Sequence, residues 1–592
     1  MEKENKLNVY LFQPQYAVEI RNENTYWLPY SAGCLWTYAH SIPYIQQHYQ
    51  LVELGFKRED PQDIINRMYQ HPPNVCGFSC YVWNEKYCLN LAEKIKQNFP
   101  HVKIVFGGAQ ANARFLDYLF VDSVILAEGE ESFVDFLTSE RPQKLYDRRR
   151  LTNLEIPSPY TSGIFDKLLE DNPNALWSMT FETNRGCPYA CTFCDWGGAT
   201  YSKVRKLDIA RVTEDLEWAI NKPISYVFCA DANFGIFKQR DLEIARVLKR
   251  VADQCAIETI NLQYAKNSTE IVFEIAQILG EYSRGVTVSV QSMHDLTLEA
   301  IKRKNMDVNK VQNLIQLSKQ YNVGTYTEVI LGLPEETLES WCQGLCEILE
   351  LGQHDSIDMW FAQVLENSEM ATKDSIEKYK ISSISSADYF ALYNRNDYKD
   401  IQEQIDLVNG TSTMSLEDLS TAYMYGWLII HWHISGYSQR IAKAVREKGI
   451  SYKEYYDELF SMVKQHEIFS KHFYLLKNLV TKYLRYGILE IDGNKSHGHN
   501  LHSFSYDYMY DKKQVAYDLA IECGEKFVKI QDVDKFIQAN FLFDSATTYP
   551  IVFDDLAIHA KQANINDLDF YSLRRKGLLK NRIEHGQTSP SI

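Results

Sequence analysis

The 592-residue sequence lacks long apolar runs, an apolar leader and an excess of basic residues. Its most apolar stretch, residues 427–434, is far shorter than the ~18 residues of a membrane-spanning helix and contains two histidines. The first six residues are too charged for a secretory signal peptide. The formal net charge of −16 disfavours general affinity for nucleic acids and anionic membranes. We therefore expect neither a membrane nor a nucleic acid among the partners.

Cysteine is sparse as well, with twelve residues in the whole chain, too few for a disulfide framework at this length. Three of the twelve lie close together as Cys187, Cys191 and Cys194, at the spacing C-x3-C-x2-C. Thiolates at such a spacing suit an iron–sulfur cluster or zinc. A structural zinc site needs a fourth ligand, and no further Cys or His lies near Cys194. The pattern favours a [4Fe–4S] cluster with one iron open to a small molecule, and its reduced thiols predict a cytoplasmic location.

The segment 183–198 resembles the cluster-binding motif of the radical SAM superfamily, down to the aromatic residue Phe193 before the third cysteine. In that family the open iron binds S-adenosylmethionine (SAM), which electron transfer cleaves to a 5′-deoxyadenosyl radical. The resemblance implies that the three cysteines are the metal ligands, that Phe193 lies against SAM, and that a flavodoxin or ferredoxin donates electrons. The alternative is three cysteines in a tight turn, buried or disulfide-paired.

Residues 1–145 alternate strands and helices, which predicts a doubly wound, Rossmann or flavodoxin-like domain with a parallel sheet. Ligands of such domains bind at the carboxyl ends of the strands. Glycine pairs in two of the following loops let the backbone approach a ligand closely. We expect strands at residues 7–12, 49–54, 74–79, 102–106 and 123–126, and helices at 31–41, 61–69, 84–98 and after 131.

This domain is similar to the cobalamin-binding domain of one branch of radical SAM enzymes, on the pieces 77–79, 107–109 and 128–130. The D-x-H-x-x-G motif that supplies an axial histidine elsewhere is absent, as is common in that branch. The alternative is a relic domain that binds nothing. We expect Tyr81 or Trp83 to cover the lower face of cobalt. The resemblance implies cobalamin contacts from Gln13, Pro14, Gln15, Ser79, Tyr81, Trp83, Asn84, Gly107, Gly108, Ala109, Gln110, Gly129 and Glu130.

A connector is expected at residues 146–172, followed by six strand–helix units over 173–370. Repeated units of this kind close into a barrel with its chemistry at the carboxyl ends of the strands. Radical SAM cores are similar, usually as a partial (β/α)6, TIM-like barrel. We expect strands at residues 177–183, 226–230, 259–264, 286–290, 325–331 and 359–364, with helices at 208–220, 240–255, 269–282, 309–321 and 338–351.

Polar residues follow these strands at the family's SAM-binding positions, in the family's order. Asp231 is expected to accept hydrogen bonds from the methionine ammonium. Ser289 and Gln291, on one face by strand alternation, match the ribose and carboxylate position. Glu335 replaces a glycine of the family's G-L-P-G-E-T segment, so we expect a slightly different turn there. The resemblance implies further SAM contacts from Asn233, Glu328 and Leu365.

Residues 371–592 are mostly helical by periodicity and match no motif, so by position they are expected to shape the substrate pocket. We interpret His431 and His433 as core or substrate-pocket histidines, and His497, His499 and His502 as a solvated loop. The expected helices are residues 416–434, 437–447, 453–465, 469–485, 514–525 and 533–539.

The joint resemblance implies an α/β enzyme with an N-terminal cobalamin-binding domain, a radical SAM barrel and a mostly helical C-terminal domain. Its reaction would move a methyl group from SAM, by way of methylcobalamin, to an unactivated carbon of a small molecule or peptide. One alternative is ring contraction, cyclisation or oxidation with the same cofactors and no methyl transfer. The non-enzymatic alternative is a cobalamin sensor or binding module.

Overall fold

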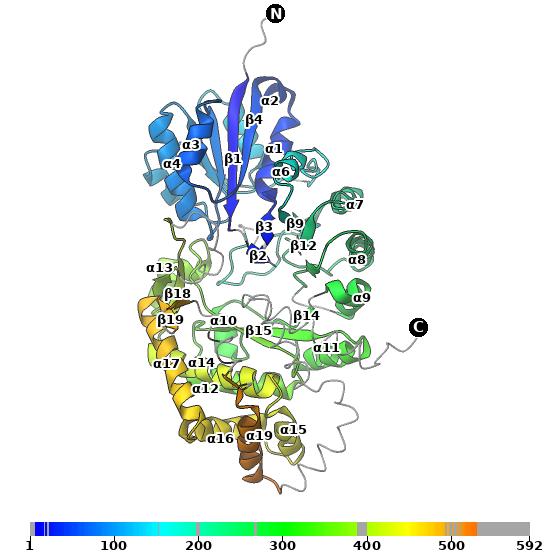
Figure 1. Ribbon diagram of the computed structural model, residues 1–592, viewed down its shortest axis with the longest axis vertical. Helices are drawn as coiled ribbons and strands as arrows, with labels where there is room; N and C mark the ends of the chain where they lie inside the picture. The colour runs from blue at the N-terminus through cyan, green and yellow to red at the C-terminus, as the bar shows by residue number, and fades with distance from the viewer. Residues whose placement is uncertain are drawn as a thin grey trace, which may run out of the picture. The chain divides into compact units, whose positions relative to one another are not determined.

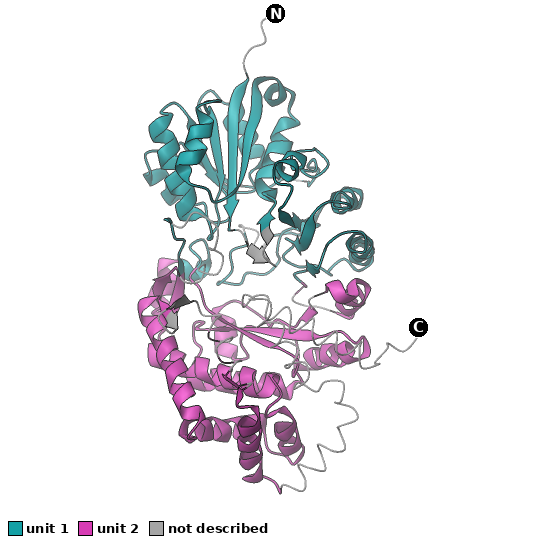
Figure 2. Cartoon of the chain, in the orientation of Figure 1, with its two compact units in different colours: residues 1–263, 365–371, 390–405 teal, residues 264–364, 372–389, 406–592 magenta. Residues whose placement is uncertain are grey.

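The computed structural model divides the chain into two compact units (Figures 1 and 2). Unit 1 comprises residues 1–263, 365–371 and 390–405, and unit 2 comprises residues 264–364, 372–389 and 406–592. The domain boundaries expected at 145, 172 and 370 stay predictions. The structure describes residues 6–16, 18–20, 23–151, 153–196, 202–265, 269–283, 285–387, 400–491, 494–496, 501, 505, 508–509 and 511–529. The helix expected at 533–539 and the loop histidines 497, 499 and 502 lie outside these residues.

The predicted doubly wound domain is confirmed as a parallel six-stranded sheet with the order β4-β1-β5-β6-β7-β8. The apolar runs form its central strands, whose side chains are almost all buried. The strands are β1 (Leu7–Gln15), β4 (Tyr49–Lys57), β5 (Val75–Ser79), β6 (Lys103–Gly107), β7 (Ser123–Ala127) and β8 (Leu145–Arg149). The helices are α1 (Tyr30–His40), α2 (Pro43–His48), α3 (Pro61–Met68), α4 (Glu85–Asn98) and α5 (Glu130–Thr138), with a short 3-10 helix η1 (Ala113–Asp117).

The strand order places a topological switch point between β1 and β5, because β4 pairs with the other edge of β1. Ligands of open parallel sheets bind where the order reverses, beyond the carboxyl ends of the strands. The predicted cobalamin loops after β1 and β5 flank this point. Strand β8 was expected to be part of a connector, but it extends the sheet beside β7, with Tyr146 buried.

A second sheet of unit 1 has the order β13-β12-β9-β3-β2 and includes two strands that the sequence did not predict. Its predicted strands are β9 (Leu176–Phe181), β12 (Ile224–Cys229) and β13 (Thr259–Asn261), with helices α7 (Ile209–Glu217) and α8 (Lys238–Ala252). The unpredicted ones, β2 (Val18–Ile20) and β3 (Glu23–Trp27), form a hairpin, and β3 lies parallel to β9. The Tyr26 ring lies 5.3 Å from Phe56 of the first sheet and 5.8 Å from Trp177 of β9. This aromatic packing holds the hairpin against both sheets.

Unit 2 carries the other three predicted barrel strands as one parallel sheet, in the order β14-β15-β16. The strands are β14 (Val286–Thr287), β15 (Thr325–Leu331) and β16 (Ile357–Phe361), and the helices are α9 (Ile271–Leu279), α10 (Asp295–Ala300), α11 (Val308–Gln320) and α12 (Leu338–Glu350). Glu335 has φ of +65°, in the left-handed region that favours glycine, and the expected difference in this turn stays a prediction.

The rest of unit 2 is mostly helical, as predicted. Its longer helices are α14 (Leu416–Leu428), continued by the π-helical turn η5 (Ile429–Ile434), α15 (Gln439–Glu447), α16 (Tyr452–Gln465), α17 (Phe469–Tyr486) and α19 (Lys513–Glu525). Shorter elements are α13 (Lys373–Tyr379) and the strand pairs β17 (Ser382–Ser386) with β18 (Ile405–Gly410) and β19 (Leu489–Ile491) with β20 (Asn494–Ser496). Trp341 of α12 donates to the Ala422 carbonyl of α14 at 3.0 Å, which ties these helices to the three-stranded sheet.

Three histidines lie in the core of the helical region, namely His431, His433 and His472. His431 and His433 are fully buried, and His433 Nε2 lies 2.9 Å from His354 Nδ1. His472 stacks on Tyr508 with ring centroids 3.9 Å apart. Burial lowers the pKa of His472 to about 4, and burial likewise lowers the pKa values of His354 and His433. This confirms the interpretation of 431 and 433 as interior residues.

Residues 400–405 belong to unit 1, although the neighbouring segments belong to unit 2. Glu403 accepts hydrogen bonds from the backbone amides of Lys86 and Tyr87, at 2.8 and 3.0 Å, and forms a fully buried ion pair with Arg58 at 2.8 Å. These amides belong to the first turn of α4, whose own N-cap residue Asn84 makes no side-chain cap hydrogen bond. Glu403 therefore caps α4 from a distant segment, where a negative charge also suits the helix dipole.

We expect Glu403→Ala to destabilise unit 1 by about 3–5 kcal/mol, because it leaves the buried Arg58 charge unpaired. The hydrogen-exchange protection of the Lys86 and Tyr87 amides should fall with it. Urea unfolding followed by hydrogen exchange and mass spectrometry measures both effects. The control is Glu377→Ala, since Glu377 pairs with Lys373 on the surface with side-chain exposures of 67% and 85%. Equal, small effects of both variants would contradict the capping role.

We expect acid to destabilise the helical region of unit 2 between about pH 6.5 and pH 4. The unfolded chain binds a proton at His472 below its ordinary pKa of ~6.5, whereas the folded chain does so only near pH 4, so stability falls as the pH falls through this window. His472→Gln should flatten the pH dependence of exchange protection in α17. Exposed His101 provides the control as His101→Gln, and identical slopes for the two variants would refute the assignment to His472.

Candidate active site

The three cysteines lie on a loop that a two-residue ribbon closes at its base. The ribbon pairs β10 (Asn184–Arg185) with β11 (Arg205–Lys206) in antiparallel register. Cys187 and Cys191 are buried and Cys194 is partly exposed. Gly186 has φ of +116°, and a Cβ there would lie 2.4 Å from the Lys203 carbonyl oxygen, so only glycine fits at the turn into the loop.

Three cysteine thiolates are a donor set that suits a [4Fe–4S] cluster, in which each thiolate binds its own iron. Asn233 Nδ2 lies 3.4 Å from Cys187 Sγ, and hydrogen bonds to ligand sulfur are one of the means by which proteins tune such clusters.

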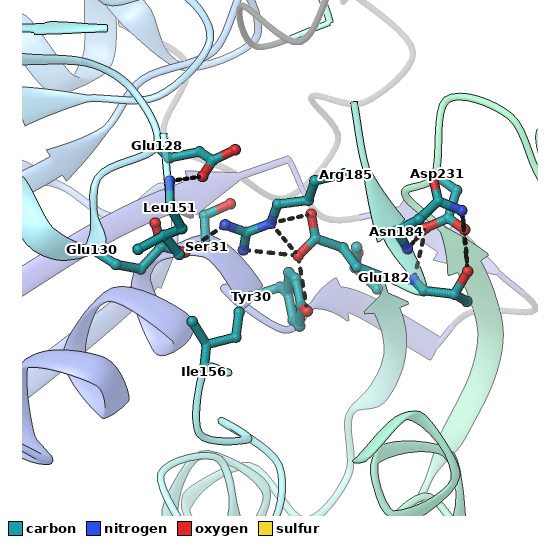
Figure 3. Close-up of polar contacts among 12 residues, drawn as sticks. Tyr30, Ser31, Glu128, Glu130, Leu151, Ile156, Glu182, Asn184, Arg185 and Asp231 are labelled. Atoms are coloured by element: carbon teal, nitrogen blue, oxygen red, sulfur yellow. Dashed lines mark hydrogen bonds and ion pairs between the residues drawn. The ribbon is translucent and has the colours of Figure 1, made fainter. Parts of the chain in front are cut away.

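Asp231 anchors the entrance to the cysteine loop. One carboxylate oxygen accepts from the backbone amides of Thr183 and Asn184, at 2.7 and 3.0 Å, and the other accepts from their side chains (Figure 3). Burial raises the pKa of Asp231 to about 7, although the hydrogen bonds from Thr183 and Asn184 oppose the rise. Arg240 donates to the Thr183 carbonyl at 2.8 Å from the other side. All of these bonds hold the start of the loop, so the expected role of Asp231 at SAM stays a prediction.

Asn233 is the better placed acceptor. Its side chain is 1% exposed, and its Oδ1 has no hydrogen-bond partner in the structure. A buried amide oxygen without a partner costs free energy, which a ligand donor would recover. The observation suits an ammonium group, and it distinguishes Asn233 from Asp231 within the predicted SAM segment. Phe193 and Leu365 are partly buried.

In unit 2, Gln291 also has a buried side-chain oxygen, Oε1, without a hydrogen-bond partner. Its backbone φ of +57° is uncommon for a residue with a side chain. Gln291 makes a single bridge to Val329 and donates its amide to the Glu328 carbonyl at 3.1 Å. The regular strand β14 ends at Thr287, earlier than predicted, so strand alternation does not fix a shared face for Ser289 and Gln291.

The loops at the switch point of unit 1 are held by Asn84. Its Oδ1 accepts from the Tyr81 amide at 2.7 Å, and its Nδ2 donates to the carbonyls of Pro14 and Ser79, at 2.9 and 3.1 Å. Gln13 is likewise committed, because its Oε1 accepts from the Ala32 amide at 3.1 Å. These buried amides shape the loops after β1 and β5 rather than remaining free for a ligand.

Two aromatic side chains follow β5 as a stacked pair. The Tyr81 and Trp83 rings lie 4.5 Å apart and are inclined by 5°. The Tyr81 hydroxyl lies 2.6 Å from Ser31 Oγ, whereas the buried Nε1 of Trp83 has no partner. A rigid aromatic surface at the carboxyl end of a parallel sheet fits a flat macrocycle such as a corrin. The expectation that one of the two lies below cobalt stays a prediction.

The glycine pair at the end of β6, Gly107 and Gly108, lies where the backbone of Cys80 approaches closely. Gly108 has φ of +95°, and a Cβ there would lie 2.5 Å from the Cys80 carbonyl oxygen. That carbonyl accepts from the Gln110 amide at 3.0 Å, which fixes the turn of residues 107–110. Of the predicted cobalamin contacts, Gly107 is the last residue of β6 and Gln15 is the last residue of β1, whereas Gly129 lies two residues beyond the end of β7.

One short segment contacts both the loop after β6 and the cysteine loop. Asn367 Nδ2 donates to the carbonyls of Ala109 and Ala111, at 2.7 and 3.3 Å. Three residues on, the Met370 amide donates to the Thr192 carbonyl at 2.8 Å, between the second and third cysteines. Residues 365–371 therefore connect the predicted cobalamin loops with the predicted cluster loop inside unit 1.

Charged residues at the base of the cysteine loop also contact the loop after β7. Arg185 donates to Glu130 at 2.7 Å and to Glu182 at 2.9 Å (Figure 3). Arg205 donates to Glu128 at 3.0 Å. The sequence reasoning placed Glu130 at cobalamin and gave no role to the other four; the only signal was that the arginines flank the cysteine motif.

In the parts of the chain that the structure describes, no helix combines the length and the apolar character that crossing a bilayer requires.

Sequence comparison identifies both halves of the site. Residues 44–137 match the B12 binding domain, and residues 181–343 match the Radical SAM superfamily. Over 470 residues the chain is 32% identical to the 2-(S-pantetheinyl)-carbapenam-3-carboxylate methyltransferase of Streptantibioticus cattleyicolor, covering 73% of this chain and 67% of that protein. It is 32% identical over 466 residues to the cobalamin-dependent radical SAM methyltransferase TokK of Streptomyces tokunonensis, with the same coverage of 73% and 67%.

Solved structures share the fold. The radical SAM methyltransferase TsrM of Kitasatospora setae, with tryptophan substrate and a SAM analog bound, superposes with a TM-score of 0.50 at 14% identity, covering 72% of this chain and 91% of that one. The cobalamin-dependent radical enzyme OxsB, with aqua-cobalamin bound, gives a TM-score of 0.50 at 12% identity, covering 98% and 84%. Given the sequence relatives above, the chain belongs to the cobalamin-dependent radical SAM methyltransferases, whose cofactors are a [4Fe–4S] cluster, SAM and cobalamin.

Proposed function

We propose that this protein transfers a methyl group from SAM to an unactivated carbon of a small molecule. The observation that carries the proposal is the segment 365–371, which joins the loop after β6 to the cysteine loop. A reaction that takes a radical from one cofactor and a methyl group from the other requires that both cofactors face the same substrate. The shared segment 365–371 fixes the two loops relative to each other. When bound, the cluster and SAM supply a hydrogen-abstracting radical, and cobalamin supplies the methyl group.

The residues proposed for each cofactor are given unit by unit. In unit 1, Cys187, Cys191 and Cys194 hold the cluster, and Phe193, Asn233 and Leu365 contact SAM. The SAM contacts expected from Ser289, Gln291 and Glu328 of unit 2 stay predictions. At the corrin we propose the stacked pair Tyr81 and Trp83, with backbone from Pro14, Gln15, Ser79, Gly107, Gly108, Ala109, Gln110 and Gly129. Gln13, Asn84 and Asp231 support these groups from behind, because their polar atoms are already bonded within the protein.

The substrate class follows from the relatives. One of them is named for 2-(S-pantetheinyl)-carbapenam-3-carboxylate, a small carboxylic acid, which favours a small molecule over a peptide. We propose a carboxylate-bearing compound of comparable size and place its recognition in the helical region, residues 371–592.

We further propose a cytoplasmic enzyme that receives electrons from a flavodoxin or ferredoxin. None of the twelve cysteines of the sequence forms a disulfide in the structure. Reduced cysteines and an oxidation-sensitive cluster suit a reducing compartment.

Methyl transfer is tested with trideuteromethyl-labelled SAM. Reconstituted enzyme, reductant and 2-(S-pantetheinyl)-carbapenam-3-carboxylate as probe should yield a product in which one hydrogen is replaced by a trideuteromethyl group, together with 5′-deoxyadenosine. Mass spectrometry detects both. The control is the Cys191→Ser enzyme, which should form neither. Product formation without label, alongside 5′-deoxyadenosine, would instead establish a reaction without methyl transfer.

The proposed division between Asn233 and Asp231 has its own test. Asn233→Ala should weaken SAM binding about tenfold or more at normal iron content, because a hydrogen bond to a charged group is lost. Asp231→Asn should instead lower iron incorporation, since the asparagine side chain cannot accept the four hydrogen bonds from Thr183 and Asn184 that Asp231 accepts. Anaerobic SAM titration and iron analysis separate the two. Weakened SAM binding by Asp231→Asn at full iron content would return the ammonium contact to Asp231.

A further inference from the structure

The two glutamates around Gly129 each bind an arginine of the ribbon that closes the cysteine loop. Glu128 accepts from Arg205 at 3.0 Å and from the Leu151 amide at 2.8 Å. Glu130 accepts from Arg185 at 2.7 Å, and Glu182 binds the same guanidinium from the other side at 2.9 Å (Figure 3). One three-residue stretch after β7 therefore holds both ends of the loop that carries the cysteines.

The register of the ribbon explains why the carboxylates are needed. Arg185 and Arg205 are direct cross-strand partners in β10 and β11. Like charges in directly opposed positions repel each other and destabilise a strand pair. Glu128 and Glu130, two residues apart in sequence, supply one negative charge to each arginine. The two-residue ribbon is too short to be stable on its own, so these ion pairs add to the bonds that Asp231 and Arg240 make at the start of the loop.

These ion pairs are largely shielded from water. The side chains of Arg185 and Arg205 are 14% and 16% exposed, and those of Glu130 and Glu128 are 6% and 16% exposed. Burial opposes the charge on Glu128, but the hydrogen bonds from Arg205 and Leu151 hold its pKa below the ordinary value. Glu130 is the first residue of α5, where the helix dipole favours a carboxylate. Removing one partner of such a pair leaves the other charge buried and unpaired.

We propose that Glu128 and Glu130 are positioning residues that fasten the cluster loop to the corrin-side loop after β7. The proposal rests on the proposed function for the identity of the two cofactors. It reassigns Glu130, which the family resemblance had placed at cobalamin: Glu130 Oε1 is bound to Arg185, and this ion pair compensates the carboxylate charge, although Oε2 is buried without a hydrogen-bond partner. The four charged residues then act together with the segment 365–371 to hold the cysteine loop relative to the loops at the end of the parallel sheet.

Glu128→Gln, Glu130→Gln and Arg205→Gln test the proposal in the reconstituted full-length enzyme without substrate. The matched control is Glu131→Gln, the next residue along the chain and the second residue of α5, since Glu131 is 42% exposed and lies 3.9 Å from Arg149. Three quantities are measured: the rate at which an iron chelator strips the cluster, the dissociation constant for cobalamin, and the dipolar coupling between the reduced cluster and cob(II)alamin in electron paramagnetic resonance. Thermal unfolding checks that each variant is folded.

Glu128→Gln, Glu130→Gln and Arg205→Gln are the clamp variants, and for them we expect iron loss about tenfold faster than in the parent enzyme and a changed dipolar coupling. Their cobalamin affinity should stay within about threefold of the parent value. Glu131→Gln should match the parent in all three quantities. The double variant Glu128→Gln/Arg205→Gln should be no worse than either single one, because both remove the same pair. Arg205→Lys should restore part of the iron retention. If one of the clamp variants does not fold, Arg205→Lys, which keeps the positive charge, still tests the proposal through the dipolar coupling.

Two results would overturn the proposal. One is a cobalamin affinity lowered tenfold or more by Glu130→Gln with iron loss unchanged, which would make Glu130 a corrin contact. The other is iron loss and dipolar coupling in all clamp variants equal to those of Glu131→Gln. Neither measurement uses substrate, so a failure of methyl transfer in the labelling experiment would leave this test intact.

Discussion

Compensation of buried charge organises unit 1. The cysteine loop begins at a carboxylate, Asp231, that four hydrogen bonds surround, and it closes on arginines that Glu128 and Glu130 neutralise. The helix that follows the loop after β5 begins at another buried carboxylate, Glu403. In each case the charge comes from a segment far away in the sequence. A buried charge that loses its partner destabilises the fold, so these contacts favour one arrangement of the loops over others.

Much of the fold could be predicted because its strands are apolar runs separated by amphipathic helices. All six predicted barrel strands are present, and so are the helices predicted for the C-terminal region that fall within the described residues. Their ends shift by a few residues. The strands β3 and β8 were missed for a physical reason. Their sequences, ENTYW and LYDRR, are short and rich in polar residues, and only pairing with a neighbouring strand stabilises them.

The candidate site was predictable where chemistry imposes a local spacing. The cysteines are recognised by their own pattern, and the glycines at 107 and 108 by their place after a strand. The partners of the buried charges have no recognisable spacing in the sequence, since Glu128 and Arg205 are 77 residues apart and Arg58 and Glu403 are 345 residues apart. Asp231 illustrates the same limit: its position suggested a ligand contact, whereas its surroundings in the fold give it four protein donors.

The hairpin of β2 and β3 makes the doubly wound region and the first barrel strands inseparable as folding modules. Thr25, Tyr26 and Trp27 pair with residues 176–178, so the edge of β9 is covered by chain that precedes the second strand of the first sheet. A fragment that began near residue 173 would expose the backbone groups of β9 that β3 now covers, where another chain could add as a strand. Any cut between the two cofactor regions of this chain therefore opens a sheet edge.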